Sequence, residues 1–167
     1  MFYFLSLFSG ILISLMVVSN GGLSEQYGLH SATVLVHFSG LILITLLVLQ
    51  KKERPFAKIQ RLYLYLGGAL GVFITVFPNF AFGRISVSAI LALLLLGQTV
   101  AGLIVDQIGF LDMPTHPFTK KKIIGLLLIL GGIIYMINDF EIVAIVLTFI
   151  SGILIVIART LNARLAV

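Results

Sequence analysis

The 167-residue sequence has no cysteine, no tryptophan and few charges. The absence of cysteine excludes disulfides, thiolate metal sites and cysteine nucleophiles. Without tryptophan the usual membrane-interface anchor is missing, so tyrosines are expected to take its place at helix ends. Charged residues form 10% of the chain, whereas a soluble domain carries about 25%. So few charges cannot cover a surface that faces water.

Motifs for catalysis and for ATP hydrolysis are also missing. The phosphate-binding pattern G-x-x-x-x-G-K-[ST] does not occur, which excludes ATP as an energy source within this chain. The three histidines, His30, His37 and His116, lie in different settings, whereas an enzyme needs a convergent cluster of reactive groups. The sequence therefore predicts no catalytic residue, no cofactor and no metal site.

Long apolar segments dominate what is present. Hydrophobic residues form 60% of the chain, and its mean hydropathy is +1.19. A transmembrane helix needs about 20 mainly apolar residues, and the strict alternation of barrel strands is absent. The predicted fold class is an all-α integral membrane protein with six transmembrane helices. These spans are approximately 2–20, 31–50, 61–83, 86–106, 122–138 and 141–160.

The basic residues are distributed unequally between the two predicted sides of the membrane. The side of the N-terminus receives the connections 51–60 and 107–121, whereas the other side receives 21–30 and carries Arg84 as its one basic residue. This asymmetry predicts a multi-pass protein of the inner (plasma) membrane with both termini cytoplasmic, and no nucleic-acid partner. The basic residues of the cytoplasmic side are Lys51, Lys52, Arg54, Lys58, Arg61, Lys120, Lys121, Lys122, Arg159 and Arg164.

One pattern occurs twice at an offset of 142 residues. The pentapeptide SGILI begins at Ser9 and again at Ser151, and an Asn-x-x-Leu follows each copy, from Asn20 and from Asn162. The second copy lies in the sixth predicted helix, five spans after the first, so its helix runs in the opposite direction to the first helix, as in the inverted repeats of secondary transporters. Chance is the alternative, since these residues are common in membrane helices. We expect a five-helix unit at 1–140 and the first helix of an inverted second unit at 141–167.

Several short motifs resemble the YdcZ family of the drug/metabolite transporter superfamily. They are the repeated first-helix pattern, His37 to Gly40, Gly67-Gly68-x-x-Gly71, Gly97-Gln98, the stretch Ile104 to Gly109, and Gly125 after Pro-Phe-Thr. The resemblance implies five-helix units that work in pairs, either as two chains or fused in one ten-helix chain. Six helices fit neither form, so the chain is expected to be part of a truncated or split ten-helix protein.

Polar groups within the spans are the candidate substrate-lining residues, because buried polar groups in a bilayer face the bundle interior. They are Asn20, His37, Pro78, Asn79 and Gln98. Each has a structural alternative: Asn20 as a helix cap, His37 as an interior histidine, and Pro78 as a kink. Close helix packing is the expected role of Gly67, Gly68 and Gly71.

Carboxylates are predicted only at or beyond helix ends, which gives no support to proton-coupled cation antiport. The leading hypothesis is a carrier of a small molecule that works by alternating access with an oppositely oriented five-helix unit, in a homodimer or with a paired protein. The alternative is a non-transporting membrane subunit that assembles with or regulates another membrane protein. A channel is disfavoured, because no helix carries a continuous polar stripe.

Overall fold

A computed structural model of the chain describes residues 2–51, 60–109, 115, 120–136 and 141–165. Within these ranges it has six α-helices, one 3₁₀-helix and no strand, which confirms the predicted all-α fold with six helices. Five helices are long and apolar enough to cross a membrane, and α5 is shorter. The elements are α1 (Phe2–Tyr27), α2 (Leu29–Lys51), η1 (Leu62–Tyr65), α3 (Leu66–Ala81), α4 (Val87–Ile108), α5 (Lys120–Met136) and α6 (Ile142–Leu165).

The first predicted connection, 21–30, is wrong, because helix continues through most of it. α1 passes through Gly21 and ends only at Tyr27. One residue, Gly28, separates α1 from α2, with a φ of 83° that favours glycine. Glycine costs only about 1 kcal/mol relative to alanine inside a helix, and the packing of Gly21 against Phe82 offsets this preference.

The remaining boundaries lie close to the predicted ones where the structure describes them. The third span begins with η1 and continues as α3, and α4 begins after Ser86, whose Oγ accepts from the Ala89 N–H at 3.2 Å. Most of the connections 51–60 and 107–121, the link at Asp139-Phe140, and His116 lie outside the described residues.

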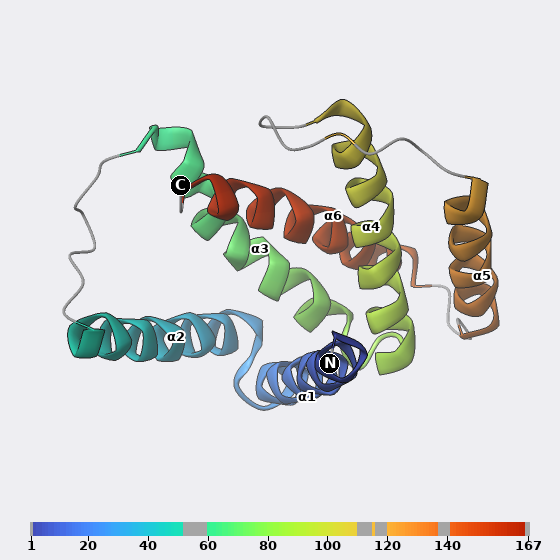
Figure 1. The fold of residues 1–167 in the computed structure, drawn as a ribbon. Helices are drawn as coiled ribbons and strands as arrows, with labels where there is room; N and C mark the ends of the chain where they lie inside the picture. Colours follow the sequence, from blue (N-terminus) through green and yellow to red (C-terminus); the bar gives the residue numbers. More distant parts are fainter. Residues whose placement is uncertain (1, 52–59, 110–114, 116–119, 137–140, 166–167) are drawn as a thin grey trace.

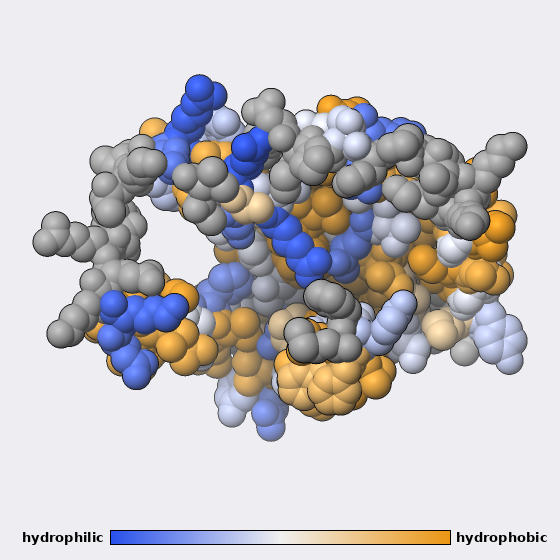
Figure 2. All heavy atoms as spheres, in the orientation of Figure 1, coloured by the Kyte–Doolittle hydropathy of each residue, from blue (hydrophilic) through white to orange (hydrophobic). Residues whose placement is uncertain are grey.

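The centre of the bundle is formed by α3, α4 and α6 (Figure 1). α6 packs against both α3 and α4, α5 flanks α4, and α1 and α2 pack against each other and against α3. The core lies where α4 meets the start of α6, around Ala89, Ile90, Leu93 and Ala144. Figure 2 shows hydrophobic side chains over the outer surfaces of α2 and α5, as expected for helices that face lipid.

A proline inside α3 creates the polar contact between α3 and α6. Pro78 has no N–H, so the carbonyl of Ile74, four residues earlier, has no helical donor. Ser151 of α6 is fully buried, and its Oγ donates a hydrogen bond to that carbonyl at 3.1 Å. The hydroxyl therefore satisfies a backbone group that would otherwise be buried without a partner.

We expect Ser151→Ala to destabilise the protein by about 1–2 kcal/mol, because the Ile74 carbonyl then stays buried and unpaired. In a Pro78→Ala background the restored N–H of residue 78 can reach the same carbonyl, so the cost of Ser151→Ala should fall by at least half. Reversible unfolding in mixed micelles measures this double-mutant cycle. Equal costs in the two backgrounds would show that the two residues are not coupled.

α4 and α6 approach each other through two glycines. A Cβ built on Gly97 would lie 3.0 Å from the Cα of Gly152, and a Cβ on Gly152 would lie 2.9 Å from the Cα of Gly97. Backbone carbonyls of Phe149 and Leu94 lie even closer to these two positions. The helices therefore touch backbone to backbone, a packing mode that small residues permit in membrane proteins.

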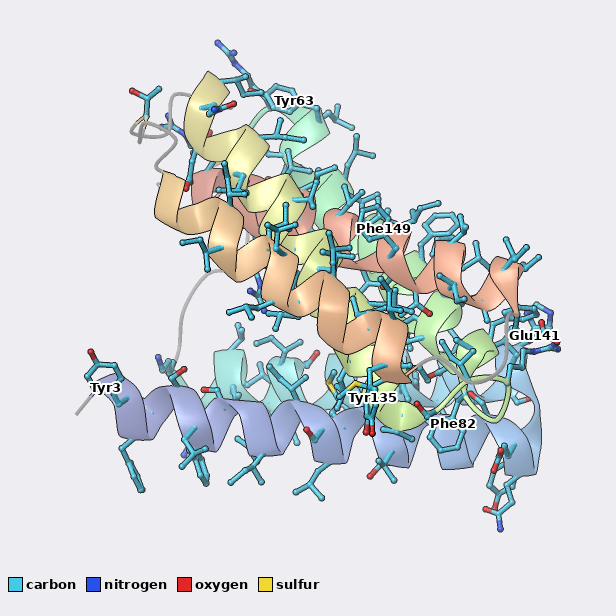
Figure 3. The ribbon with its side chains drawn as sticks, turned by 90° about the vertical axis from the view of Figure 1, so that its right-hand side faces the viewer. Tyr3, Tyr63, Phe82, Tyr135, Glu141 and Phe149 are labelled. Carbon is cyan, nitrogen blue, oxygen red and sulfur yellow. The ribbon has the colours of Figure 1, made fainter. Side chains whose placement is uncertain are left out.

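α1 and α6 run in opposite directions along α3. Gly21, late in α1, packs against Phe82, which follows the end of α3, whereas Asn162, late in α6, packs against Gly67 at the start of α3. In Figure 3, α1 runs from Tyr3 toward the region of Phe82, and α6 starts beside Glu141 and runs back through Phe149. The two copies of the repeated pattern thus lie on helices of opposite sense.

Candidate functional site

A cavity of about 600 Å³ lies between α1, α3, α4 and α6. Ligand pockets typically measure about 300–1,000 Å³, so this one can hold a small molecule. Most of its wall is aliphatic, with leucine and isoleucine from α3, α4 and α6. Its polar lining residues are Ser14, Thr75, Asn79, Gln98, Arg159 and Asn162.

Gln98 and Arg159 join α4 to α6 at the cavity wall. The Arg159 guanidinium donates to Gln98 Oε1 at 3.3 Å, and Gln98 Nε2 donates to the Leu94 carbonyl at 3.3 Å. Both ends of the Gln98 amide are therefore engaged. Gln98 lies about 17 Å along α4 at 1.5 Å per residue, near the middle of the helix.

Asn79 is the buried polar side chain of the cavity. It is 7% exposed, follows the buried Pro78 in α3, and lines the cavity. Its Nδ2 is buried and has no hydrogen-bond partner among the described residues. A buried amide donor without a partner costs about 1–3 kcal/mol, so its position at a cavity wall suggests a ligand-binding role.

Two predicted lining residues lie elsewhere. Asn20 is half-buried within the long α1, about two turns before its end at Tyr27, so it neither lines the cavity nor caps the helix. His37 is half-buried on α2, with Nδ1 2.8 Å from the Thr33 carbonyl. The structure thus brings together Pro78, Asn79 and Gln98 and leaves Asn20 and His37 outside the cavity.

The three glycines of α3 differ in their surroundings. Gly67 is buried against α6, where an added Cβ would meet Asn162 and lie 3.1 Å from the Ala158 carbonyl. Gly71 faces α2, with His37 Nε2 3.8 Å from a Cβ built there, and Gly68 has open space. Close helix packing therefore describes the position of Gly67, not that of Gly68.

Sequence reasoning missed Arg159 and Asn162 as cavity residues, because Arg159 was interpreted only as a topology signal. A pattern in α6 could have revealed them. Ser151, Ile155, Arg159 and Asn162 follow at intervals of four, four and three residues, which places them on one helical face. That face contacts α3 through Ser151 and lines the cavity through the other three residues.

The described carboxylates lie at helix ends. Glu25 is near the end of α1, Asp106 is near the end of α4, and Glu141 directly precedes α6. None of them is among the residues that line the cavity. Arg159 is the one charged side chain in that lining, so the described part of the site is electropositive.

Five helices long and apolar enough to cross a membrane, with a mostly aliphatic cavity between four of the helices, are the features of a multi-pass membrane protein. A family model described as "Putative inner membrane exporter, YdcZ" matches residues 1–135. The chain belongs to this family of the drug/metabolite transporter type, an exporter family rather than an enzyme family, as its motifs predicted. Comparison with curated proteins and with solved structures gives no match.

Proposed function

We propose that the chain is one half of an alternating-access carrier, in which an oppositely oriented five-helix unit supplies the other half. The main support is the position of α6. This helix carries the second copy of the α1 pattern, and it packs into the groove between α3 and α4 through Ser151 and Gly152. If 1–140 and 141–167 belong to two repeat units, α6 is the first helix of the second unit. Its packing against α3 and α4 then represents the contact between the two units.

If the two units are related by the repeat, α1 should pack against the second unit as α6 packs against the first. Ser9 and Gly10 correspond to Ser151 and Gly152, yet both are exposed, and a Cβ on Gly10 would meet nothing within 4 Å. We propose that the face of α1 that carries these two residues docks into the corresponding groove of the second unit.

The partner is a separate unit rather than a simple second copy of the chain. In this chain α6 already fills the α3–α4 groove, so a second copy would have to release its own α6 before it could accept α1. A paired protein, or a continuation of the chain, offers an unoccupied groove. With both termini cytoplasmic, as the basic residues indicate, that unit would insert in the opposite orientation.

Accessibility labelling tests the carrier proposal, and the chain has no cysteine of its own to interfere. Thr75→Cys places a thiol at the cavity wall. In host membranes with the partner present, an impermeant maleimide should label it from both sides, because alternating access opens the cavity to each side in turn. Loss of labelling from either side would contradict the proposal.

Three matched variants make this result interpretable. Glu25→Cys should react only from outside and Lys51→Cys only from inside, which also tests the proposed orientation. Thr45→Cys lies exposed on α2, facing lipid, and should react from neither side. A non-transporting subunit would show Thr75→Cys behaving as Thr45→Cys does.

A further inference from the structure

Arg159 is exposed in the isolated chain, but its side chain lines the cavity and contacts Gln98. Its Cα lies about 26 Å along α6, a helix of about 36 Å at 1.5 Å per residue. Helical side chains tilt toward the N-terminus of their helix, so the long arginine reaches back from there toward the middle. Its contact with Gln98, near the middle of α4, agrees with this direction.

A purely topological arginine would behave differently. Arginines near helix ends extend toward the headgroups, because a charge in the apolar region is costly. Arg159 instead contacts a mid-helix glutamine and lines a cavity with no carboxylate in its described wall. An ionisable group in this position is typical of a substrate site.

We infer that the cavity binds a small organic monocarboxylate with an apolar body, held by Arg159 and Asn79. The guanidinium fork matches a carboxylate. Asn79, which is 7% exposed, supplies another donor through its Nδ2, which has no partner among the described residues. One cation balances a monoanion, whereas a phosphate monoester carries nearly two charges. The aliphatic wall accommodates the apolar body.

This assignment rests on the proposed carrier function, because the carboxylate would be its substrate. Gln98 is a positioning residue in this arrangement. Its Oε1 accepts from Arg159 while its Nε2 is held by the Leu94 carbonyl, so it directs the guanidinium without neutralising it. The positive charge remains available to a ligand.

Equilibrium dialysis of the detergent-solubilised chain against benzoate, benzamide and benzylamine tests the inference, with empty micelles subtracted. The three probes share a ring and differ in head-group charge. We expect benzoate to bind at least tenfold more tightly than benzamide and benzylamine not to bind. Absence of benzoate binding, or a preference for the amine or the amide, would overturn the inference.

Variants tie the binding to the arginine. Arg159→Gln should weaken benzoate binding at least tenfold, Arg159→Lys should recover part of it, and Arg84→Gln should bind as the unmodified chain does. Arg84 stacks on Phe80, 4.1 Å from its ring centroid, outside the cavity lining. Equal weakening of benzoate binding by Arg159→Gln and Arg84→Gln would overturn the inference. The unfolding midpoint of each variant is measured as well, so that binding is compared only between folded proteins.

Benzoate binding requires neither a partner unit nor transport. The binding experiment therefore tests the carboxylate site independently of the labelling experiment, which tests the carrier proposal. Benzoate binding without two-sided labelling of Thr75→Cys would remove the carrier and keep the site. Two-sided labelling without benzoate binding would keep the carrier and remove the carboxylate assignment.

Discussion

Gly152→Leu is expected to separate α4 from α6 and to destabilise the protein by more than about 3 kcal/mol, the upper end of ordinary overpacking costs. The reason is that the new side chain would meet backbone, not a side chain that can rotate away. Its Cβ alone would lie 2.9 Å from the Cα of Gly97 and 3.1 Å from the backbone N of Gln98. Reversible unfolding in mixed micelles measures the loss.

The repeat itself provides the matched control. Gly10 is the counterpart of Gly152 in the repeated pentapeptide, and a Cβ at Gly10 meets nothing within 4 Å. Gly10→Leu should leave the stability of the isolated chain unchanged or raise it by up to about 1 kcal/mol through helix propensity. Similar losses for the two variants would show that the two copies occupy equivalent environments, contrary to the structure.

The helices could be predicted from hydropathy because each span is long and nearly free of charge. The continuation of α1 through Gly21 could not, because local propensity disfavours helix there and the compensating contact with Phe82 comes from a residue 61 positions away. The bond between Ser151 and Ile74 spans 77 positions. Pro78 does identify the unpaired carbonyl four residues earlier, but not the helix that supplies the donor.

The candidate site was predictable only in part, for a related reason. In a helix of a soluble protein the polar face is the one exposed to water. These membrane helices are apolar on most sides, so the spacing of their apolar residues does not show which face packs against a neighbouring helix. Pro78, Asn79 and Gln98 were predicted because they are polar or irregular within apolar spans. Arg159 was missed because a basic residue near a helix end has a simpler topological explanation.

Gly21→Leu is expected to detach one wall of the cavity. An added Cβ at Gly21 would overlap the ring of Phe82, so the phenyl group must leave its place against α1. We expect a loss of about 2–3 kcal/mol, within the range for overpacking. Gly22, the next residue, has open space at the same point, so Gly22→Leu should cost nothing and serves as the control.

The compensating variant separates this contact from a general weakening of α1. Phe82→Ala alone should cost about 2 kcal/mol, less than a fully buried phenylalanine because the ring is half-buried. Together with Gly21→Leu, however, it removes the clash, so the double variant should recover at least about 1 kcal/mol relative to the summed losses. Strictly additive losses would contradict a direct Gly21–Phe82 contact.

The contact also bears on function, because α1 carries Gly10 and Ser14 into the cavity wall. If Phe82 holds α1 against the end of α3, then Gly21→Leu should raise the rate at which a maleimide labels Thr75→Cys, and adding Phe82→Ala should return that rate toward its original value. An unchanged rate in Gly21→Leu, despite the loss of stability, would mean that the α1 wall does not control access to the cavity.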